Sequence, residues 1–162
     1  MSEQLHDDLG VTLKTVITAS IEEAIRRGAA KVEAEHLLLS IAASGDAAAQ
    51  ALADAGLDYP AIEAALQDER ARALRAAGIE PVSDERLHAT RNSRPVWGAS
   101  IRDALRRGDF KAHRNRGSAE RERLAVADAL IGVLRADLGT VPRAIEYAGV
   151  DRAALIARLE RF

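Results

Sequence analysis

Side chains that could support catalysis or metal binding are few and scattered in this sequence. It contains no cysteine, which excludes disulfides, thiolate metal sites and a cysteine nucleophile. The four histidines lie far apart, and none has a second ligand at the spacing of a helical metal site. No serine stands in a Gly-x-Ser-x-Gly turn, and no Gly-x-x-x-x-Gly-Lys phosphate loop occurs. We therefore predict a protein that is not an enzyme and that uses no metal or cofactor.

Charge is unevenly divided along the 162 residues. Residues 1–85 carry a net charge of −9, whereas residues 86–123 carry +7. One interpretation is that the basic segment binds nucleic acid or another anionic partner. The alternative is a helix surface with internal ion pairs, since Arg121 and Arg123 alternate with glutamates. The candidate patch for an anionic partner consists of Arg106, Arg107, Lys111, Arg114 and Arg116.

The composition favours helices and a small aliphatic core. Hydrophobic residues make up 48% of the chain but aromatic residues only 3%, and the strong helix formers Ala and Leu are abundant. We expect Trp97 and Phe110 to be core or groove residues rather than platforms for nucleic-acid bases. No apolar run approaches the ~20 residues of a membrane span, and the first residues lack an apolar signal region. These features predict a cytoplasmic protein with no membrane partner.

Apolar residues at helical spacing predict a series of helices and no sheet. The predicted helices cover residues 13–27, 34–44, 46–55, 58–77, 97–107, 118–134, 140–148 and 151–162. Residues 34–44 are apolar on nearly every side, which predicts a central buried helix. Ser118 is the predicted cap of its helix, and residues 109–117 form a predicted basic loop. Prolines interrupt residues 80–95, which form either a linker or a short helix with broken ends.

An internal repeat is the most informative feature of the sequence. Residues 51–66 align with 144–159 at an offset of 93 residues, and residues 36–42 align with 128–134 at an offset of 92. Both copies contain a glycine that ends one helix and an aspartate that caps the next. These structural positions are Gly56 and Asp58, and Gly149 and Asp151. We infer two copies of a four-helix unit that pack together as one globular domain with pseudo-twofold symmetry.

This pattern resembles the Clp N-terminal domain family, whose members are built from two Clp repeats. The first repeat carries the resemblance through Glu-Glu-Ala in its first helix, Glu35-His36-Leu-Leu-Leu in its second, and the Gly-Leu-Asp junction at Gly56. The second repeat is more degenerate. The expected organisation is a flexible N-terminus at 1–11, a first repeat at 12–79, a linker at 80–94, and a second repeat at 95–162 with a basic insertion near 109–123.

The resemblance implies an all-α fold and a function in protein binding. Domains of this family are mounted on ClpA-, ClpB- and ClpC-type unfoldase ATPases, to which they recruit clients or adaptor proteins. This chain would be a stand-alone relative that presents clients, competes for them as a decoy, or docks on the ATPase. The partners implied are therefore a Clp ATPase, its adaptors or its clients. We expect the Leu- and Ile-rich groove between the repeats to supply an apolar contact surface.

The resemblance also implies a ligand site in the first repeat. In ClpC-type domains a glutamate at the position of Glu35 helps to bind phosphoarginine, a mark for degradation. A carboxylate suits a guanidinium, and free N–H groups at a helix start suit phosphoryl oxygens. The candidate site therefore consists of Glu35, Ala34 and Val32, although Ala34 replaces the threonine that is common there. At the matching position of the second repeat stands Ala127, so that repeat lacks the carboxylate.

A purely structural interpretation of the same residues also exists. Glu35 lies in the first turn of its helix, where an acid stabilises the helix dipole without binding anything. His36 is expected to be structural, through a hydrogen bond to the backbone, rather than a metal ligand or catalytic group.

Overall fold

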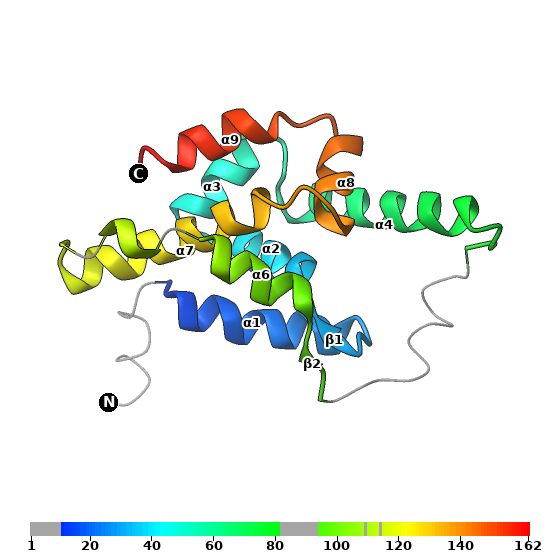
Figure 1. Cartoon of the computed structure of the whole chain (residues 1–162), viewed down its shortest axis with the longest axis horizontal. Helices are drawn as coiled ribbons and strands as arrows, with labels where there is room; N and C mark the ends of the chain where they lie inside the picture. The colour runs from blue at the N-terminus through cyan, green and yellow to red at the C-terminus, as the bar shows by residue number, and fades with distance from the viewer. Residues whose placement is uncertain (1–10, 82–93, 109, 114) are drawn as a thin grey trace.

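The computed structural model describes residues 11–81, 94–108, 110–113 and 115–162 (Figure 1). Most of the expected flexible N-terminus and most of the expected linker lie outside these ranges. The elements in chain order are α1 Leu13–Arg26, β1 Lys31–Val32, α2 Ala34–Ala43, α3 Ala47–Asp54, α4 Tyr59–Ala76, β2 Val96–Trp97, α6 Ala99–Arg107, the 3-10 turn η1 Phe110–His113, α7 Ser118–Leu134, α8 Thr140–Tyr147 and α9 Arg152–Leu159. The fold is therefore all-α, as predicted.

The helices pack as two similar sets. Helix α1 packs against α2 in the first set, and α6 packs against α7 in the second. The two pairs are also in contact with each other, because α1 touches α7 and α6 touches α2. The remaining helices cross between the sets, with α4 on α8 and α3 on α9 (Figure 1). Residues 21–28 and 101–108, at the ends of α1 and α6, also read alike, as IEEAIRRG and IRDALRRG. This arrangement is the two-repeat, pseudo-twofold fold predicted from the sequence.

The core is built around α2 and α7. The fully buried side chains of α2 are Leu37, Leu38, Leu39 and Ile41, and those of α7 are Val126, Leu130 and Leu134. Leu and Ile side chains were predicted to line an apolar groove between the repeats that a partner could contact. That prediction was wrong for these residues, because the two repeats bury these side chains against each other. Trp97 was expected in the core or a groove, but 41% of it is exposed.

Two short strands are an addition to the predicted fold. β1 and β2 pair in parallel, with Lys31 opposite Val96 and Val32 opposite Trp97. The prediction of no sheet was wrong here because two residues are too few to show the alternation that identifies a strand. The same pairing explains why α6 begins at Ala99 rather than at Trp97.

Most helix ends follow local capping rules. The side chains of Asp58 and Asp151 accept hydrogen bonds of 3.0 Å from the backbone N–H groups three residues later. Gly56 and Gly149 have φ angles of 84° and 72°, the left-handed conformation that closes the preceding helix. Ser118 is not a cap, because it is the first residue of α7 and Gly117 holds the cap position.

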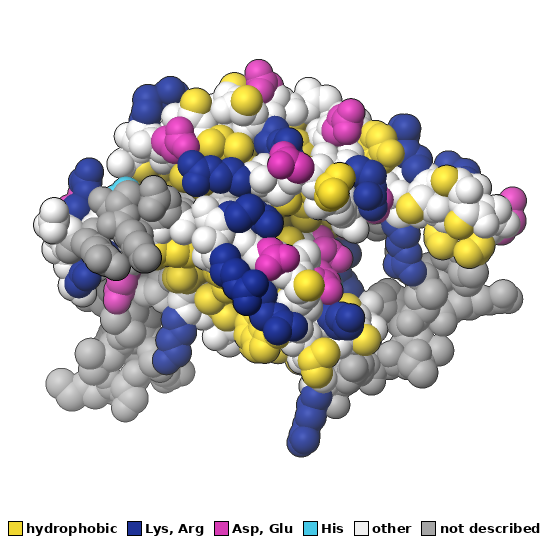
Figure 2. Space-filling view, in the orientation of Figure 1, with side chains coloured by type: hydrophobic (Ala, Val, Ile, Leu, Met, Phe, Trp, Pro, Cys, Tyr) yellow, Lys and Arg dark blue, Asp and Glu magenta, His cyan; other side chains and the backbone are white. Residues whose placement is uncertain are grey.

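The surface carries both signs of charge. Figure 2 shows dark-blue basic side chains running across the face formed by α6 and the end of α7, with magenta acidic side chains among them. Within the described ranges, no helix is both long enough and apolar enough to cross a bilayer.

Candidate ligand-binding pocket

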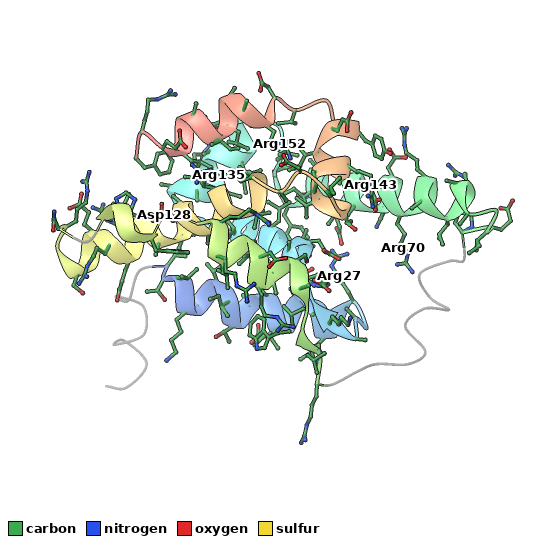
Figure 3. The ribbon with its side chains drawn as sticks, in the orientation of Figure 1. Arg27, Arg70, Asp128, Arg135, Arg143 and Arg152 are labelled. Atoms are coloured by element: carbon green, nitrogen blue, oxygen red, sulfur yellow. The ribbon has the colours of Figure 1, made fainter. Side chains whose placement is uncertain are left out.

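A large cavity lies mainly in the first repeat, between the end of α1, β1, the start of α2 and helix α4, and Thr140 of α8 also lines it. Its volume is about 1250 Å³. Arg27 and Arg70 mark this side of the molecule in Figure 3, and Asp128 of the second repeat lies at the opposite side. Its acidic lining residues are Glu23, Glu33, Glu35, Glu63 and Glu69, and its basic ones are Arg26, Arg27, Lys31 and Arg70. The cavity is therefore a polar pocket rich in charge.

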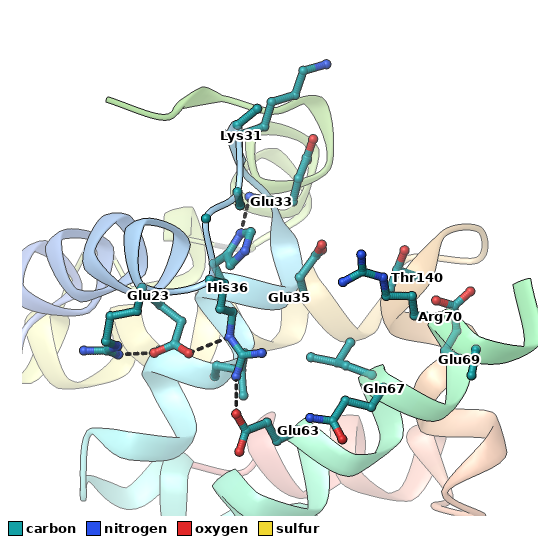
Figure 4. A pocket seen from close by; sticks show the side chains of 18 of the residues that line it. Glu23, Lys31, Glu33, Glu35, His36, Glu63, Gln67, Glu69, Arg70 and Thr140 are labelled. Carbon is teal, nitrogen blue, oxygen red and sulfur yellow. Dashed lines mark hydrogen bonds and ion pairs between the residues drawn. The ribbon is translucent and has the colours of Figure 1, made fainter. Parts of the chain in front are cut away.

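Glu35 points into this pocket from the first turn of α2 (Figure 4). Burial raises the pKa of its carboxyl above the ordinary value, and the nearby charges of Glu33 and Glu69 raise it further. In the part of the chain that the structure describes, no lysine or arginine lies within ion-pair distance of this carboxylate. A partly desolvated carboxylate in such a setting gains stability from a cationic ligand.

The other two candidate residues are placed differently from Glu35. Val32 is 1% exposed and its side chain belongs to the core. Ala34 is 5% exposed, and its backbone N–H donates a 2.8 Å hydrogen bond to Oγ of Ser100. That N–H group is therefore not free for a phosphoryl oxygen, so the side chains that share the pocket with Glu35 are better placed to contact a ligand.

An ion-pair network centred on the buried carboxylate of Glu23 forms one wall of the pocket. Glu23 is 2% exposed and pairs with Arg26 and, at 2.7 Å, with Arg27, which also reaches Glu63 of α4 at 2.7 Å. Burial alone would raise the pKa of Glu23, but hydrogen bonds from Tyr59, Arg27 and Arg26 lower it overall. The network therefore fixes α1 against α4, and Arg26 and Arg27 are already neutralised by carboxylates.

Two further cations in the pocket have no such partner. Lys31 and Arg70 line the cavity, and neither forms an ion pair with a described residue. In Figure 4 the Arg70 side chain extends from α4 toward Glu35, with Thr140 beside it. Among the described lining residues, the pocket thus brings the unpaired carboxylate of Glu35 together with the unpaired cations of Lys31 and Arg70 and the hydroxyl of Thr140.

His36 is one of the residues that line the pocket and is 4% exposed. Its Nδ1 atom accepts a 2.9 Å hydrogen bond from the backbone N–H of Glu33, so it holds the chain at the start of α2. Burial and the positive charge of Arg27 lower its pKa to about 4, which keeps the imidazole neutral at physiological pH.

A pair of caps that sequence reasoning missed holds the two helix starts together. The carboxylate of Glu33 accepts hydrogen bonds from N–H and Oγ of Ser100 at the start of α6, and Ser100 in turn accepts from Ala34 at the start of α2. Glu33 packs so closely over Gly98 that a Cβ at this position would displace the carboxylate of Glu33. Glu33 and Ser100 are 67 positions apart in the sequence, and the pairing of β1 with β2 brings them together. No local sequence pattern could have indicated this contact.

The second repeat has a much smaller pocket, of about 190 Å³. Most of its lining residues lie 92 or 93 positions after lining residues of the first pocket, with Ala127 at the position of Glu35, Asp128 at that of His36 and Phe162 at that of Glu69. Asp128 is 4% exposed and contacts Nε2 of His113 at 3.2 Å. The predicted basic loop thus contains η1, whose His113 closes this pocket.

The predicted basic patch is only partly assembled in the described chain. Arg106 pairs with Asp103 at 3.3 Å, Arg116 pairs with Glu120 at 2.5 Å, and Nε of Arg107 donates to the backbone oxygen of Gly132 at 3.0 Å. Arg114 and the side chain of Lys111 lie outside the described part. Ion pairs of this kind agree with the alternative interpretation of the basic segment as a helix surface with internal ion pairs.

Comparison with known proteins identifies the family. The model of the Clp repeat (R) N-terminal domain matches residues 9–137, which include the first repeat and α6 and α7 of the second. No curated protein matches the sequence. The matched segment is well over half of the chain and contains the mutual caps, the core helices α2 and α7, and the lining residues of the first pocket except Thr140. The chain therefore belongs to the Clp repeat N-terminal domain family.

Proposed function

We propose that this chain is a non-catalytic protein-binding module of the Clp system. It would hold an arginine-derived, phosphorylated side chain of a client or adaptor in the pocket of the first repeat. The observation that carries the proposal is the carboxylate of Glu35, which lies in a cavity of about 1250 Å³ and forms no ion pair with a described residue. A guanidinium ligand would supply that missing charge through two parallel hydrogen bonds.

The remaining charges of the pocket suit the phosphoryl end of such a ligand. Lys31 and Arg70 have no carboxylate partner among the described residues, and Thr140 adds a hydroxyl. Arg26 and Arg27 are less suitable because Glu23 and Glu63 already neutralise them. The ligand would therefore lie with its guanidinium at Glu35 and its phosphoryl group between α4 and β1.

Family membership supports a role in the Clp system, where such domains are non-catalytic parts of Clp ATPases. The module would present clients to the ATPase, compete with the ATPase's own N-terminal domain as a decoy, or dock on the ATPase. The second repeat contributes no matching site, because Ala127 lacks the carboxylate. Each copy of the chain would then bind one marked side chain.

Amide NMR titration with free phosphoarginine tests this proposal directly. Saturable shifts are expected for residues 31–39 and for α4, and none for residues 124–130. Glu35→Gln is the informative variant, since it keeps the shape of the side chain and removes its charge. Glu146→Gln, at an exposed position of α8, is the matched control and should bind as the wild type does.

Arginine and phosphoserine separate the two halves of the proposed ligand. Both should bind more weakly than phosphoarginine, because each satisfies only one end of the pocket. Absence of shifts at millimolar phosphoarginine, or equal shifts in the Glu35→Gln variant, would refute the ligand. A pull-down with the Clp ATPases and adaptors of the host would then test the protein-binding role by itself.

A further inference from the structure

A second charged surface lies outside the pocket and is formed by the arginine face of α6 and α7. We define this face by Arg102, Arg106, Arg107 and Arg135. Arg107 and Arg135 join the two helices, because Arg107 donates to the backbone oxygen of Gly132 and Arg135 donates to that of Arg107. The dark-blue run in Figure 2 crosses this part of the molecule, and Figure 3 labels Arg135 within it.

Two of these guanidinium groups are oriented without being neutralised. Arg102 donates to the carbonyl oxygens of Gly98 and Trp97, at 3.1 and 3.0 Å, and Arg107 donates through Nε alone. Within the described ranges neither of them pairs with a carboxylate. A guanidinium has five N–H donors, so each group keeps donors for a ligand while the carbonyl contacts hold it in place.

The other two arginines are paired in exposed positions, where ion pairs are weak. Arg106 contacts Asp103 at 3.3 Å and Arg135 contacts Glu160 at 2.7 Å. The face thus carries four arginines and two carboxylates, with the carboxylates set among the arginines. The two carboxylates on this face would repel a continuous phosphate backbone. Carboxylates that are spaced apart along a peptide can contact the arginines and avoid this repulsion. Val96 and Trp97, which are 61% and 41% exposed, border the face at the start of α6.

From this arrangement we propose that the arginine face binds an acidic segment of a partner protein, with an apolar residue of that segment on Val96 and Trp97. This surface is separate from the pocket of the first repeat and does not depend on phosphoarginine binding. The module would then hold two different parts of its partners at once, a phosphorylated arginine in the pocket and an acidic segment on the arginine face. The charges of the pocket complement phosphoarginine, whereas the charges of the arginine face complement an acidic segment.

The test uses the full chain and a fluorescently labelled peptide of alternating glutamate and serine with one terminal leucine. Fluorescence polarisation gives the affinity, and the fluorescence of Trp97, the single tryptophan, reports whether the peptide lies at this face. Arg102→Glu/Arg106→Glu should weaken binding at least tenfold. Arg75→Glu/Arg121→Glu makes the same change of charge at exposed positions elsewhere and should alter the affinity less than twofold.

Three results would overturn the inference. These are no peptide binding at low salt, equal loss in both double variants, and tighter binding of an eight-nucleotide oligothymidylate than of the peptide. The last result would assign the face to nucleic acid instead. Glu35→Gln should leave peptide binding unchanged, so failure of the phosphoarginine site and failure of this surface can be told apart.

Discussion

The two pockets of this molecule show how two repeats can share a fold and differ in the side chains that line their pockets. The first pocket is about 1250 Å³ and carries Glu35, whereas the second is about 190 Å³ and has Ala127 at the same place. Phe162 lines the second pocket at the position where Glu69 lines the first, and His113 contacts Asp128 there. The helix caps of both repeats are nevertheless alike. Local backbone rules have therefore persisted in both repeats, while the pocket side chains have diverged.

The largest effect should be the same in both repeats and tests whether the scaffold is equivalent. Leu38 of α2 and Leu130 of α7 lie 92 residues apart at matching core positions, with 1% and 0% exposure. Leu38→Ala and Leu130→Ala should each lower the free energy of unfolding by about 3–4 kcal/mol, because each leaves a cavity in a closed core. Urea unfolding followed by circular dichroism measures both. If the losses caused by the two variants differed by more than about 2 kcal/mol, the cores of the two repeats would not be equivalent.

The next effect should distinguish the repeats through pH. The native pKa of His36 is about 4 against an ordinary value of 6.5, so between these values the unfolded chain binds a proton that the native one does not. Stability is therefore full above pH 6.5 and falls by up to about 3 kcal/mol as the pH is lowered to 4. His36→Asn keeps an acceptor for the N–H of Glu33 and should remove this part of the pH dependence. An unchanged acid limb in the variant would contradict the assignment.

A smaller contrast separates the ends of α1 and α6. Glu23 and Asp103 occupy matching positions, but the side chain of Glu23 is 3% exposed and that of Asp103 is 50% exposed. Glu23→Gln should cost about 2 kcal/mol, because it leaves Arg26 and Tyr59 with a neutral partner while Arg27 keeps Glu63. Asp103→Asn should cost less than about 0.5 kcal/mol. Equal losses in thermal unfolding would show that burial does not decide the difference.

The smallest effect on stability is expected at the site itself. Glu35→Ala gives the first pocket the residue that the second one has. Because no described cation pairs with Glu35, the free energy of unfolding should change by less than about 0.5 kcal/mol. A loss above about 1.5 kcal/mol would mean that Glu35 serves the fold, as the helix-dipole interpretation requires, and not a ligand.

The sequence predicted those features that depend on neighbouring residues. Glycine–aspartate junctions define helix ends within a few positions, so the repeat and its caps at Asp58 and Asp151 could be recognised without a structure. The contact between Glu33 and Ser100 could not, because it joins residues 67 positions apart. Two further contacts could not be predicted for the same reason. Arg107 donates to the backbone oxygen of Gly132 between α6 and α7, and His113 contacts Asp128.

The mutual caps of Glu33 and Ser100 have a consequence for how the chain folds. Ser100 supplies the acceptor for Ala34 in α2, and Glu33 supplies the acceptor for Ser100 in α6, so neither helix start is complete until both repeats are present. Contacts between such distant residues form slowly, because a long loop must close first. Folding should therefore proceed as one cooperative transition of both repeats together. Either repeat expressed alone would fray at the start of its own capped helix.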